Sequence, residues 1–275
     1  MRPETSAPQP SAPEGFDSSG RVNPSRMSAG TPTLPSSPAE RFEASGKATP
    51  IQAETQSSEA ALRQEICRVG RSLFERGYVH ATAGNISALL PDGQLLITPT
   101  DACLGNLDSA QLALVDAQGR QLSGERASKT LALHRCIYGA DPQAGCVIHT
   151  HSTALVALTL EGVWQADRIL PPITPYFVMK VGPVPLVPYR RPGDPWVGQW
   201  VAERIATMIE RGRPLRAVML DRLGPQVWHR SPAQASAVLE ELEETARLWR
   251  SCQPRPQPLS EEQVQELREV FGAVW

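Results

Sequence analysis

Apolar residues recur every three or four positions in several stretches of the chain, which is the pattern of helices with one buried face. The first stretch begins near Glu59 and ends at Gly77. Its apolar positions are Leu62, Ile66, Val69, Leu73 and Phe74. This spacing predicts an amphipathic helix that opens the folded part of the chain.

A second long helix carries its own start signal. Ser231 is placed to cap it, Pro232 suits the first helical position, and Gln234 occupies the capping-box position. Its apolar stripe consists of Val238, Leu239, Leu242, Ala246 and Trp249. Weaker patterns predict helices over residues 128–139, 153–160, 197–210 and 260–270, with Ser128 and Ser152 capping the first two.

Short apolar runs bounded by turn residues predict strands between these helices. Leu89 and Leu90 lead into the turn Pro91-Asp92-Gly93, and residues 95–97 return as the second strand of a hairpin. Residues 112–116, the run Val147-Ile148 and residues 215–220 have the same character. Residues 170–188 are rich in proline and β-branched residues, so we expect them to be extended or looped.

Composition divides the chain into three parts. Residues 1–58 contain nine prolines, and Phe16 and Phe42 are their only aromatic residues. Such a segment buries too little apolar surface to offset its ordering entropy, so we expect a disordered extension. It could serve as a linker or docking tail, reflect a start codon placed upstream of Met27, or have no function. Residues 59–252 are the expected folded domain, and 253–275 a C-terminal tail with a short helix.

Charge and cysteine content narrow the class of protein. The formal net charge of −2 argues against a broad nucleic-acid surface. Five cysteines, none in a Cys-x-x-Cys pair, fit thiols in a reducing cytoplasm. There is no apolar run of membrane-spanning length and no pattern typical of a secretory signal. We therefore expect a cytoplasmic protein that binds neither nucleic acid nor membrane.

His149-Thr150-His151 follows the strand run Val147-Ile148 and holds two of the five histidines. Side chains repeat with period two in a strand, so both imidazoles leave the same face, with Cα atoms roughly 7 Å apart. That separation lets both reach one metal ion, and Zn²⁺ takes nitrogen ligands at about 2.0–2.1 Å. The alternative is a pair of partly buried histidines, hydrogen-bonded at a strand end.

Two loops of small residues are candidates for holding an anion. One is residues 80–87, which include Gly84 and Asn85, and the other is residues 98–101, which include Thr100. Free amides and hydroxyls in such loops can cradle an oxyanion. Ser128 adds a helix start, whose unpaired amides attract anions. Ordinary hairpin turns are the alternative interpretation of both loops.

Taken together, these motifs resemble the class II aldolase/adducin family. The resemblance covers roughly residues 60–252 and is carried by five motifs in the family's order and spacing: residues 83–87, 98–100, 128–129, 133–138 and 149–152. Residues 128–129, 174–176 and 187–193 most resemble its 3-oxo-tetronate 4-phosphate decarboxylase branch. The resemblance implies a three-layer α/β/α sandwich with a mostly antiparallel central sheet. It also implies a homotetramer with active sites between subunits.

The resemblance assigns roles residue by residue. His149 and His151 match zinc ligands, one ion per subunit. Five residues match the pocket for the substrate phosphate: Gly84, Asn85, Thr100, Ser128 and Lys129. Lys129 could alternatively hold the carboxylate. Tyr176 resembles a tyrosine that carries a proton to a neighbouring subunit's site, and His134 matches a family histidine best interpreted as part of the core.

Two positions depart from the family. Its catalytic glutamate falls at Thr130, and its third metal histidine falls at Leu223, before Gly224. A catalytic zinc generally has three protein ligands, so a third ligand is missing here. Asp221 lies two residues before Leu223 and is one candidate substitute. The others are oxygens of the substrate, or a site without metal.

The resemblance implies a metal-dependent carbon–carbon lyase acting on a small phosphorylated sugar acid. Decarboxylation of 3-oxo-tetronate 4-phosphate to dihydroxyacetone phosphate and CO₂ is the favoured reaction. An aldol reaction needs a base to take a proton from carbon, whereas decarboxylation needs only a later proton donor, so loss of the glutamate favours the decarboxylase. The alternatives are a sugar-phosphate aldolase or epimerase, and an adducin-like association module without catalysis.

Overall fold

The computed structural model describes residues 59–275. The interpretation of residues 1–58 as an extension therefore lies outside the described part of the chain. Within that part, the first helix begins at Glu59, as the hydrophobic pattern predicts.

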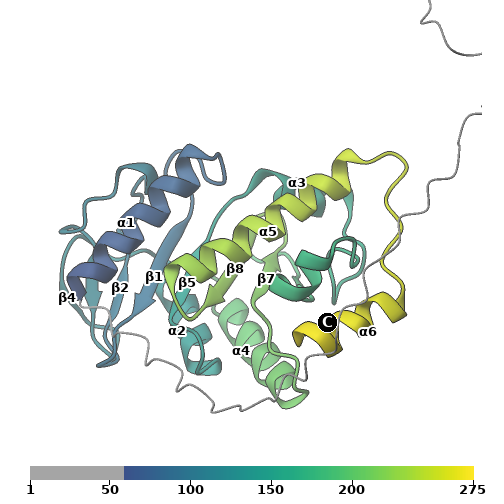
Figure 1. The fold of residues 1–275 in the computed structure, drawn as a ribbon. Coiled ribbons are helices and arrows are strands. Elements are labelled where there is room, and N and C mark those ends of the chain that lie inside the picture. Colours follow the sequence, from purple (N-terminus) through teal and green to yellow (C-terminus); the bar gives the residue numbers. More distant parts are fainter. Residues whose placement is uncertain (1–58) are drawn as a thin grey trace, which may run out of the picture. The chain divides into compact units, whose positions relative to one another are not determined.

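One eight-stranded sheet organises residues 59–275, in the order β4-β3-β2-β1-β5-β8-β7-β6 (Figure 1). Its strands are β1 (Asn85–Leu89), β2 (Leu95–Ile97), β3 (Ala113–Val115), β4 (Gln121–Ser123), β5 (Cys146–His149), β6 (Leu186–Val187), β7 (Ala217–Leu220) and β8 (Gly224–His229). Neighbouring strands are antiparallel except β6 and β7, which are parallel. The expected mostly antiparallel sheet is confirmed.

Helices pack against this sheet. They are α1 (Glu59–Glu75), α2 (Leu131–Ala140), α3 (Thr153–Glu161), α4 (Pro195–Glu210), α5 (Pro232–Ser251) and α6 (Glu261–Phe271), with short helical turns η1 (Leu104–Asn106) and η2 (Phe177–Val181). Among the helices of residues 59–275, none has the length and hydropathy that a membrane span requires.

The alternation of side chains along β5 divides the core in two. Cys146 and Ile148 belong to a cluster built with apolar residues of α1, α3 and α5. Val147, between them, belongs to a second cluster, which contains residues of α2 and α4. Successive side chains of a strand leave opposite faces, so the two helix groups cover opposite faces of the sheet. His149 lies on the α2 and α4 face, two positions after Val147.

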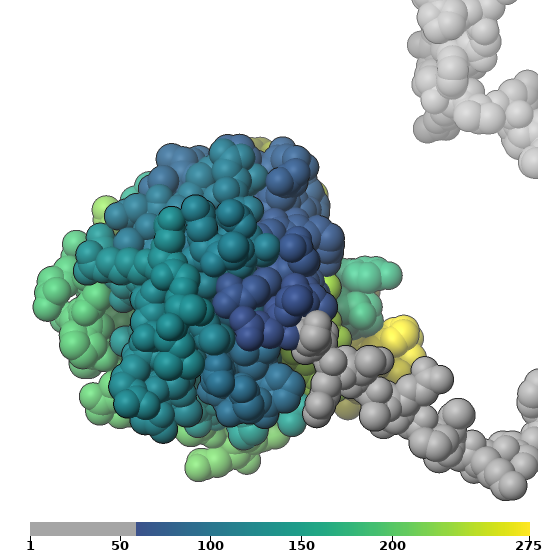
Figure 2. All heavy atoms as spheres, turned by 90° about the vertical axis from the view of Figure 1, so that its left-hand side faces the viewer, coloured from purple at the N-terminus to yellow at the C-terminus, as the bar shows by residue number. Residues whose placement is uncertain are grey.

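Strand β4 forms one edge of the sheet, and its three residues are exposed. Figure 2 views the protein from this side, where the early part of the described chain, coloured blue to teal, covers the surface. The Gln121 amide folds back to donate hydrogen bonds to the carbonyl oxygens of Ser123, Gly124 and Glu125. These bonds occupy the carbonyl groups of the last residue of β4 and of the two residues that follow it.

Three predicted caps differ from the structure in detail. Thr130, not Ser128, stands at the N-cap of α2. Ser152 is the N-cap of α3, but its hydroxyl donates to the Tyr78 carbonyl oxygen instead of capping the helix. Ser231 caps α5 as predicted, accepting from the Gln234 amide nitrogen. The Gln234 side chain, however, lies 2.8 Å from Nδ1 of His229, so no capping box closes there.

The stretch expected to be extended or looped contains more regular structure than predicted. Residues 177–181 form one π-helical turn, and Leu186–Val187 pair in parallel with β7. Strand β8 was not predicted either, because Gly224 and Pro225 at its start are turn residues in most contexts. The sequence pattern therefore missed the strand that pairs with the histidine strand.

The start of α3 is capped from α5. Both carboxylate oxygens of Glu243 accept backbone hydrogen bonds, from Ala154 at 2.9 Å and from Leu155 at 3.0 Å. Glu243 is fully buried, and burial raises the pKa of its carboxyl group. This contact fixes the helix that follows the histidine motif.

We expect Glu243→Leu to lower the free energy of unfolding by about 1–3 kcal/mol, because two buried amides lose their acceptor. Glu243→Gln keeps one carbonyl acceptor and should lose less. Urea denaturation of the two variants and the wild type measures the difference. Equal stability of Glu243→Leu and wild type would contradict this role.

The C-terminal residues pack against the domain. Val264, Ala273 and Trp275 are buried in the same cluster as α1 and α5. The Trp275 ring meets Phe177 edge to face, with centroids 5.3 Å apart. Helix α6 has a complete capping box, in which Ser260 and Gln263 bond each other's backbone amides.

Candidate active site

The two histidines of the motif meet at the end of β5. His149 is the last residue of the strand, and His151 follows it before α3. Their ring centroids are 5.0 Å apart. The structure therefore brings the two predicted metal ligands together, although His151 lies just beyond the strand that was expected to hold both.

One ring nitrogen of His149 is hydrogen-bonded, and the other is available to a metal ion. Its Nδ1 lies 2.9 Å from the Pro225 carbonyl oxygen, so Nδ1–H donates and Nε2 keeps its lone pair. Burial, with neighbouring His151 as a smaller cause, lowers the pKa of His149 to about 4. Burial also lowers the pKa of half-buried His151, with His80 adding to the effect. Both imidazoles are neutral at pH 7, the form that binds metal ions.

The position of the family's third histidine offers no donor atom. Leu223 lines the cavity next to His149, and its side chain is apolar. Gly224 follows with φ +137°, and a Cβ there would collide with the Thr150 carbonyl oxygen, so glycine is required. Within residues 59–275, no group of three or more His, Cys, Asp or Glu side chains is placed to hold a metal ion. This result includes Asp221, one of the candidate substitutes.

One hydrogen-bonded chain connects part of the predicted phosphate pocket. Thr130 donates from its hydroxyl to Oδ1 of Asn85 at 2.9 Å, and its Oγ1 lies 3.0 Å from Oγ of Ser128. Gly84 adopts φ +89°, and a Cβ there would lie 2.8 Å from the His149 carbonyl oxygen. The structure thus joins Gly84, Asn85 and Ser128 to the histidine strand, with Thr130 at their centre.

The second predicted loop, residues 98–101, lies against the segment that precedes α2. The Ser128 amide donates to the Thr98 carbonyl oxygen, and the Thr100 amide donates to that of Arg126. Lys129 is largely exposed, and its Nζ lies 3.8 Å from Oδ2 of Asp101. Thr100 is in this loop, but it is not among the residues that line the neighbouring cavity.

A cavity of about 420 Å³ opens beside His149. Lys129 and Thr130 line it from the start of α2, and the first turn of α4 lines it from the other side. Arg190 and Arg191, which the sequence analysis did not assign to the site, also line it. In the sequence they form a basic pair within residues 187–193, a segment that resembles the decarboxylase branch. The cavity therefore combines one buried histidine with three cationic side chains.

Two predicted residues lie elsewhere. Tyr176 is 61% exposed at the start of η2 and does not line the cavity of its own chain. His134 is fully buried on α2, with Nδ1 2.7 Å from Oγ of Ser87. Burial and neighbouring His149 lower the pKa of His134 to about 3. His134 is thus a core residue, close enough to His149 for the two imidazoles to affect each other electrostatically.

The buried His134 predicts how stability depends on pH. Its pKa is near 6.5 in an unfolded chain, so below that pH only the unfolded state gains its proton and the free energy of unfolding falls. The loss continues down to the folded-state value of about 3. From pH 7 to pH 5, metal-free wild type should lose about 2 kcal/mol more than His134→Gln. Denaturation curves at both pH values measure this, and equal losses would show that His134 takes up the proton in the folded protein.

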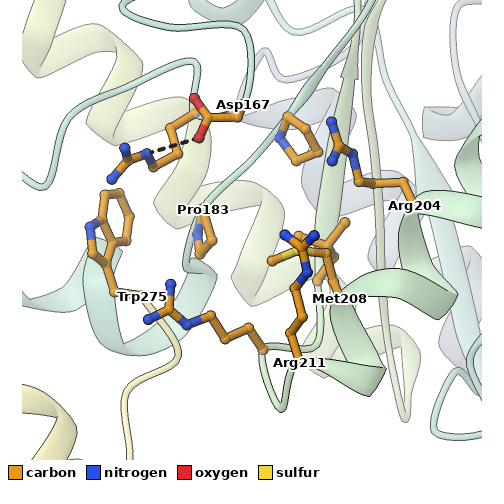
Figure 3. A pocket seen from close by; sticks show the side chains of 10 residues that line it. Asp167, Pro183, Arg204, Met208, Arg211 and Trp275 are labelled. Carbon is orange, nitrogen blue, oxygen red and sulfur yellow. Dashed lines mark ion pairs between the residues drawn. The ribbon is translucent and has the colours of Figure 1, made fainter.

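A second hollow, of about 210 Å³, lies near the C-terminal end of α4 (Figure 3). It is lined by four arginines: Arg168, Arg204, Arg211 and Arg213. The ion pair drawn there joins Arg168 and Asp167, at 3.5 Å. None of the predicted site residues line this hollow, so the histidine cavity is the candidate active site.

The family described as Class II Aldolase and Adducin N-terminal domain matches residues 64–250. The 3-oxo-tetronate 4-phosphate decarboxylase of Cupriavidus necator is 54% identical over 224 residues, which are 80% of this chain and 100% of the relative.

Solved structures agree with that relationship. The crystal structure of YgbL from Escherichia coli, described as a putative aldolase/epimerase/decarboxylase, aligns with a TM-score of 0.71 and 42% identity, covering 76% of this chain and 99% of that one. An L-fuculose 1-phosphate aldolase aligns with a TM-score of 0.63 over 79% of this chain and 99% of that one. Its identity is 21%, so it shows a shared fold alone.

Proposed function

The chain belongs to the class II aldolase and adducin family, and from that membership we propose that it is a carboxy-lyase that converts 3-oxo-tetronate 4-phosphate to dihydroxyacetone phosphate and CO₂. The observation that carries the proposal is the 54% identity to a decarboxylase of that name along the whole length of that relative. The cavity supports it, because His149 and three cationic side chains line one space.

The substrate is a four-carbon β-keto acid with an anionic group at each end. Lys129, Arg190 and Arg191 line the cavity and provide positive charge for the carboxylate and the phosphate. Loss of CO₂ leaves an electron pair on carbon 2, which is delocalised onto the keto oxygen as an enediolate. Protonation of carbon 2 then gives dihydroxyacetone phosphate.

The donor atoms beside the cavity fit a divalent metal ion. His149 and His151 are neutral, and the hydrogen bond to the Pro225 carbonyl leaves Nε2 of His149 available. When bound, such an ion supplies Lewis-acid stabilisation of the charge on the keto oxygen. We propose zinc, because the two protein donors are imidazole nitrogens, which zinc accepts readily.

Thr130 favours decarboxylation over the aldol reaction, the other reaction that this family performs on similar substrates. Its hydroxyl donates to Asn85 and lines the cavity, and it carries no charge. It therefore holds Asn85 of the predicted phosphate pocket in place but cannot serve as a strong base. Decarboxylation does not require a base at carbon, because the leaving CO₂ supplies the electron pair. The same substitution removes the base that aldol chemistry needs.

The remaining features are part of the proposal. Exposed Tyr176 suits a proton donor that acts in the site of a neighbouring subunit, which agrees with the homotetramer that we propose. The two cores on opposite faces of the sheet support a three-layer α/β/α sandwich. We also propose that the protein works in the cytoplasm, in carbohydrate metabolism, and binds neither nucleic acid nor membrane.

The phosphate pocket leads to a binding prediction. Ser128 and Lys129 precede α2, where helix-terminal amides and a full positive charge attract an anion. Lys129→Ala should weaken binding of the phosphorylated substrate by about 1.5–3 kcal/mol, the range for hydrogen bonds to charged groups. The unphosphorylated analogue should be affected much less. Calorimetric titration measures both, with Lys180→Ala, outside the cavity, as the control. Equal losses for both ligands would assign Lys129 to the carboxylate.

A direct test of the proposed function compares substrates. Purified protein with added Zn²⁺ receives 3-oxo-tetronate 4-phosphate or the unphosphorylated acid, and dihydroxyacetone phosphate or dihydroxyacetone is followed. We expect a much higher kcat/KM for the phosphorylated acid. Failure to turn over the phosphorylated acid with Zn²⁺, Mn²⁺ or Mg²⁺ would refute the proposal.

A further inference from the structure

Gln226 lies beside His149 in the sheet, although nothing in the family pattern marks it. The two residues are Cα partners in the antiparallel pairing of β5 with β8. Directly opposite side chains in such a pair leave the same face and lie in contact range. Both residues also line the 420 Å³ cavity. The sheet register therefore places an amide next to the buried metal-ligand candidate.

The Gln226 amide is buried and has no hydrogen-bond partner within residues 59–275. The residue has no exposed surface, and both Oε1 and Nε2 lack a partner. Leaving a buried polar group unpaired costs about 1–3 kcal/mol, and native proteins rarely tolerate it without a reason. The neighbouring cavity residues Leu220 and Leu223 are apolar, so they cannot satisfy the amide. A ligand that enters the cavity can.

The proposed metal site still needs a third protein ligand. Two neutral histidines do not complete a catalytic site, and Leu223 supplies no donor. Asp221 lines the same cavity but is not grouped with the histidines in a metal-binding arrangement. Amide carbonyl oxygens are established ligands of divalent ions. Gln226 is thus the polar group that the register brings to His149 and that has no other partner within residues 59–275.

We propose that Oε1 of Gln226 is the third protein ligand of the metal centre, together with His149 and His151. The inference rests on the proposed metal-dependent function and deepens it. The ligand comes from within β8, three residues after position 223, which lies just before the strand. A nitrogen donor at position 223 is thereby replaced by an oxygen donor at position 226.

The test measures metal binding without turnover. Metal-free wild type, Gln226→Leu, Gln226→Glu and Asp221→Asn are titrated calorimetrically with Zn²⁺ and with Mn²⁺. Loss of a residue that only orients a ligand already lowers metal affinity 10–100-fold. We therefore expect Gln226→Leu to lose at least about 10-fold in affinity, Gln226→Glu to bind as tightly as wild type or tighter, and Asp221→Asn to be unchanged. Circular dichroism confirms folding, and Gln226→Glu carries the test if Gln226→Leu fails to fold.

The outcomes separate this inference from the proposed function. Wild-type affinity in Gln226→Leu, or weaker binding in Gln226→Glu than in wild type, would overturn it. Metal loss in Asp221→Asn with retention in Gln226→Leu would overturn it in favour of Asp221. Decarboxylation by a wild type that binds no metal would overturn the inference and leave the function standing. The expected metal-binding pattern without decarboxylation would support the ligand assignment and refute the function.

Discussion

We expect the His149→Ala/His151→Ala double variant to lose its divalent metal and about 10³-fold or more in the rate of decarboxylation. Lewis-acid stabilisation of a developing charge is worth several kcal/mol, and about 4 kcal/mol corresponds to that factor. The two ring centroids are 5.0 Å apart, and Nε2 of His149 is available to a metal ion. The double variant removes both imidazole donors. Elemental analysis of the purified variant and a coupled assay for dihydroxyacetone phosphate measure the two effects.

His80→Ala is the matched control for that experiment. His80 is an exposed histidine near enough to His151 to lower the pKa of that imidazole, but it does not line the cavity. Its removal should leave metal content and rate close to those of wild type. Metal-free wild type with full activity would contradict the metal centre, and metal retained by the double variant would place the ion elsewhere.

The second large effect concerns the choice of reaction. We expect wild type to cleave ketose 1-phosphates at least about 10²-fold more slowly than it decarboxylates 3-oxo-tetronate 4-phosphate. Cleavage requires removal of the proton of the carbon-4 hydroxyl, and the reverse reaction requires removal of a proton from carbon. A positioned base contributes about 10²–10⁴-fold to such a step, and Thr130 stands where the family has a carboxylate. Its hydroxyl is neutral and donates to Asn85 at 2.9 Å, so Thr130 offers no charged base.

Substitutions at Thr130 test this explanation. Thr130→Glu should raise cleavage of ketose 1-phosphates more than it raises decarboxylation. Thr130→Gln introduces a side chain of nearly the same size as glutamate but without its charge, and it should raise the rate of neither reaction. Release of dihydroxyacetone phosphate from each substrate is followed at the same enzyme concentration. An equal gain in Thr130→Gln would show that side-chain size, not basicity, limits the aldol reaction.

The sequence predicted elements whose burial follows one simple period. Helix α1 has one apolar face and lies where expected, and the β1–β2 hairpin has the predicted turn. Strand β1, however, begins at Asn85, inside the segment that was predicted to be a loop. Strand β8 was missed because it begins with Gly224 and Pro225 and is buried on both faces, so neither alternation nor composition marks it. Local periodicity cannot reveal a strand that is defined by its neighbours.

Contacts between distant residues account for most other differences. Glu243 caps α3 across 89 positions of sequence, so Ser152 did not need to do so. The Gln226 amide is adjacent to His149 only through the register of β5 with β8. The histidine motif and the grouping of Gly84, Asn85 and Ser128 were predictable, because these residues are close in sequence or match the spacing of a known family.

The most direct test of the account supplies 3-oxo-tetronate 4-phosphate labelled with ¹³C at the carboxylate, together with Zn²⁺, to the purified protein. Mass spectrometry follows labelled CO₂, and a coupled assay follows dihydroxyacetone phosphate. We expect both to appear in equal amounts, faster than any ketose 1-phosphate is cleaved. Dihydroxyacetone phosphate formed from a ketose 1-phosphate faster than labelled CO₂ is released from the keto acid would contradict this expectation.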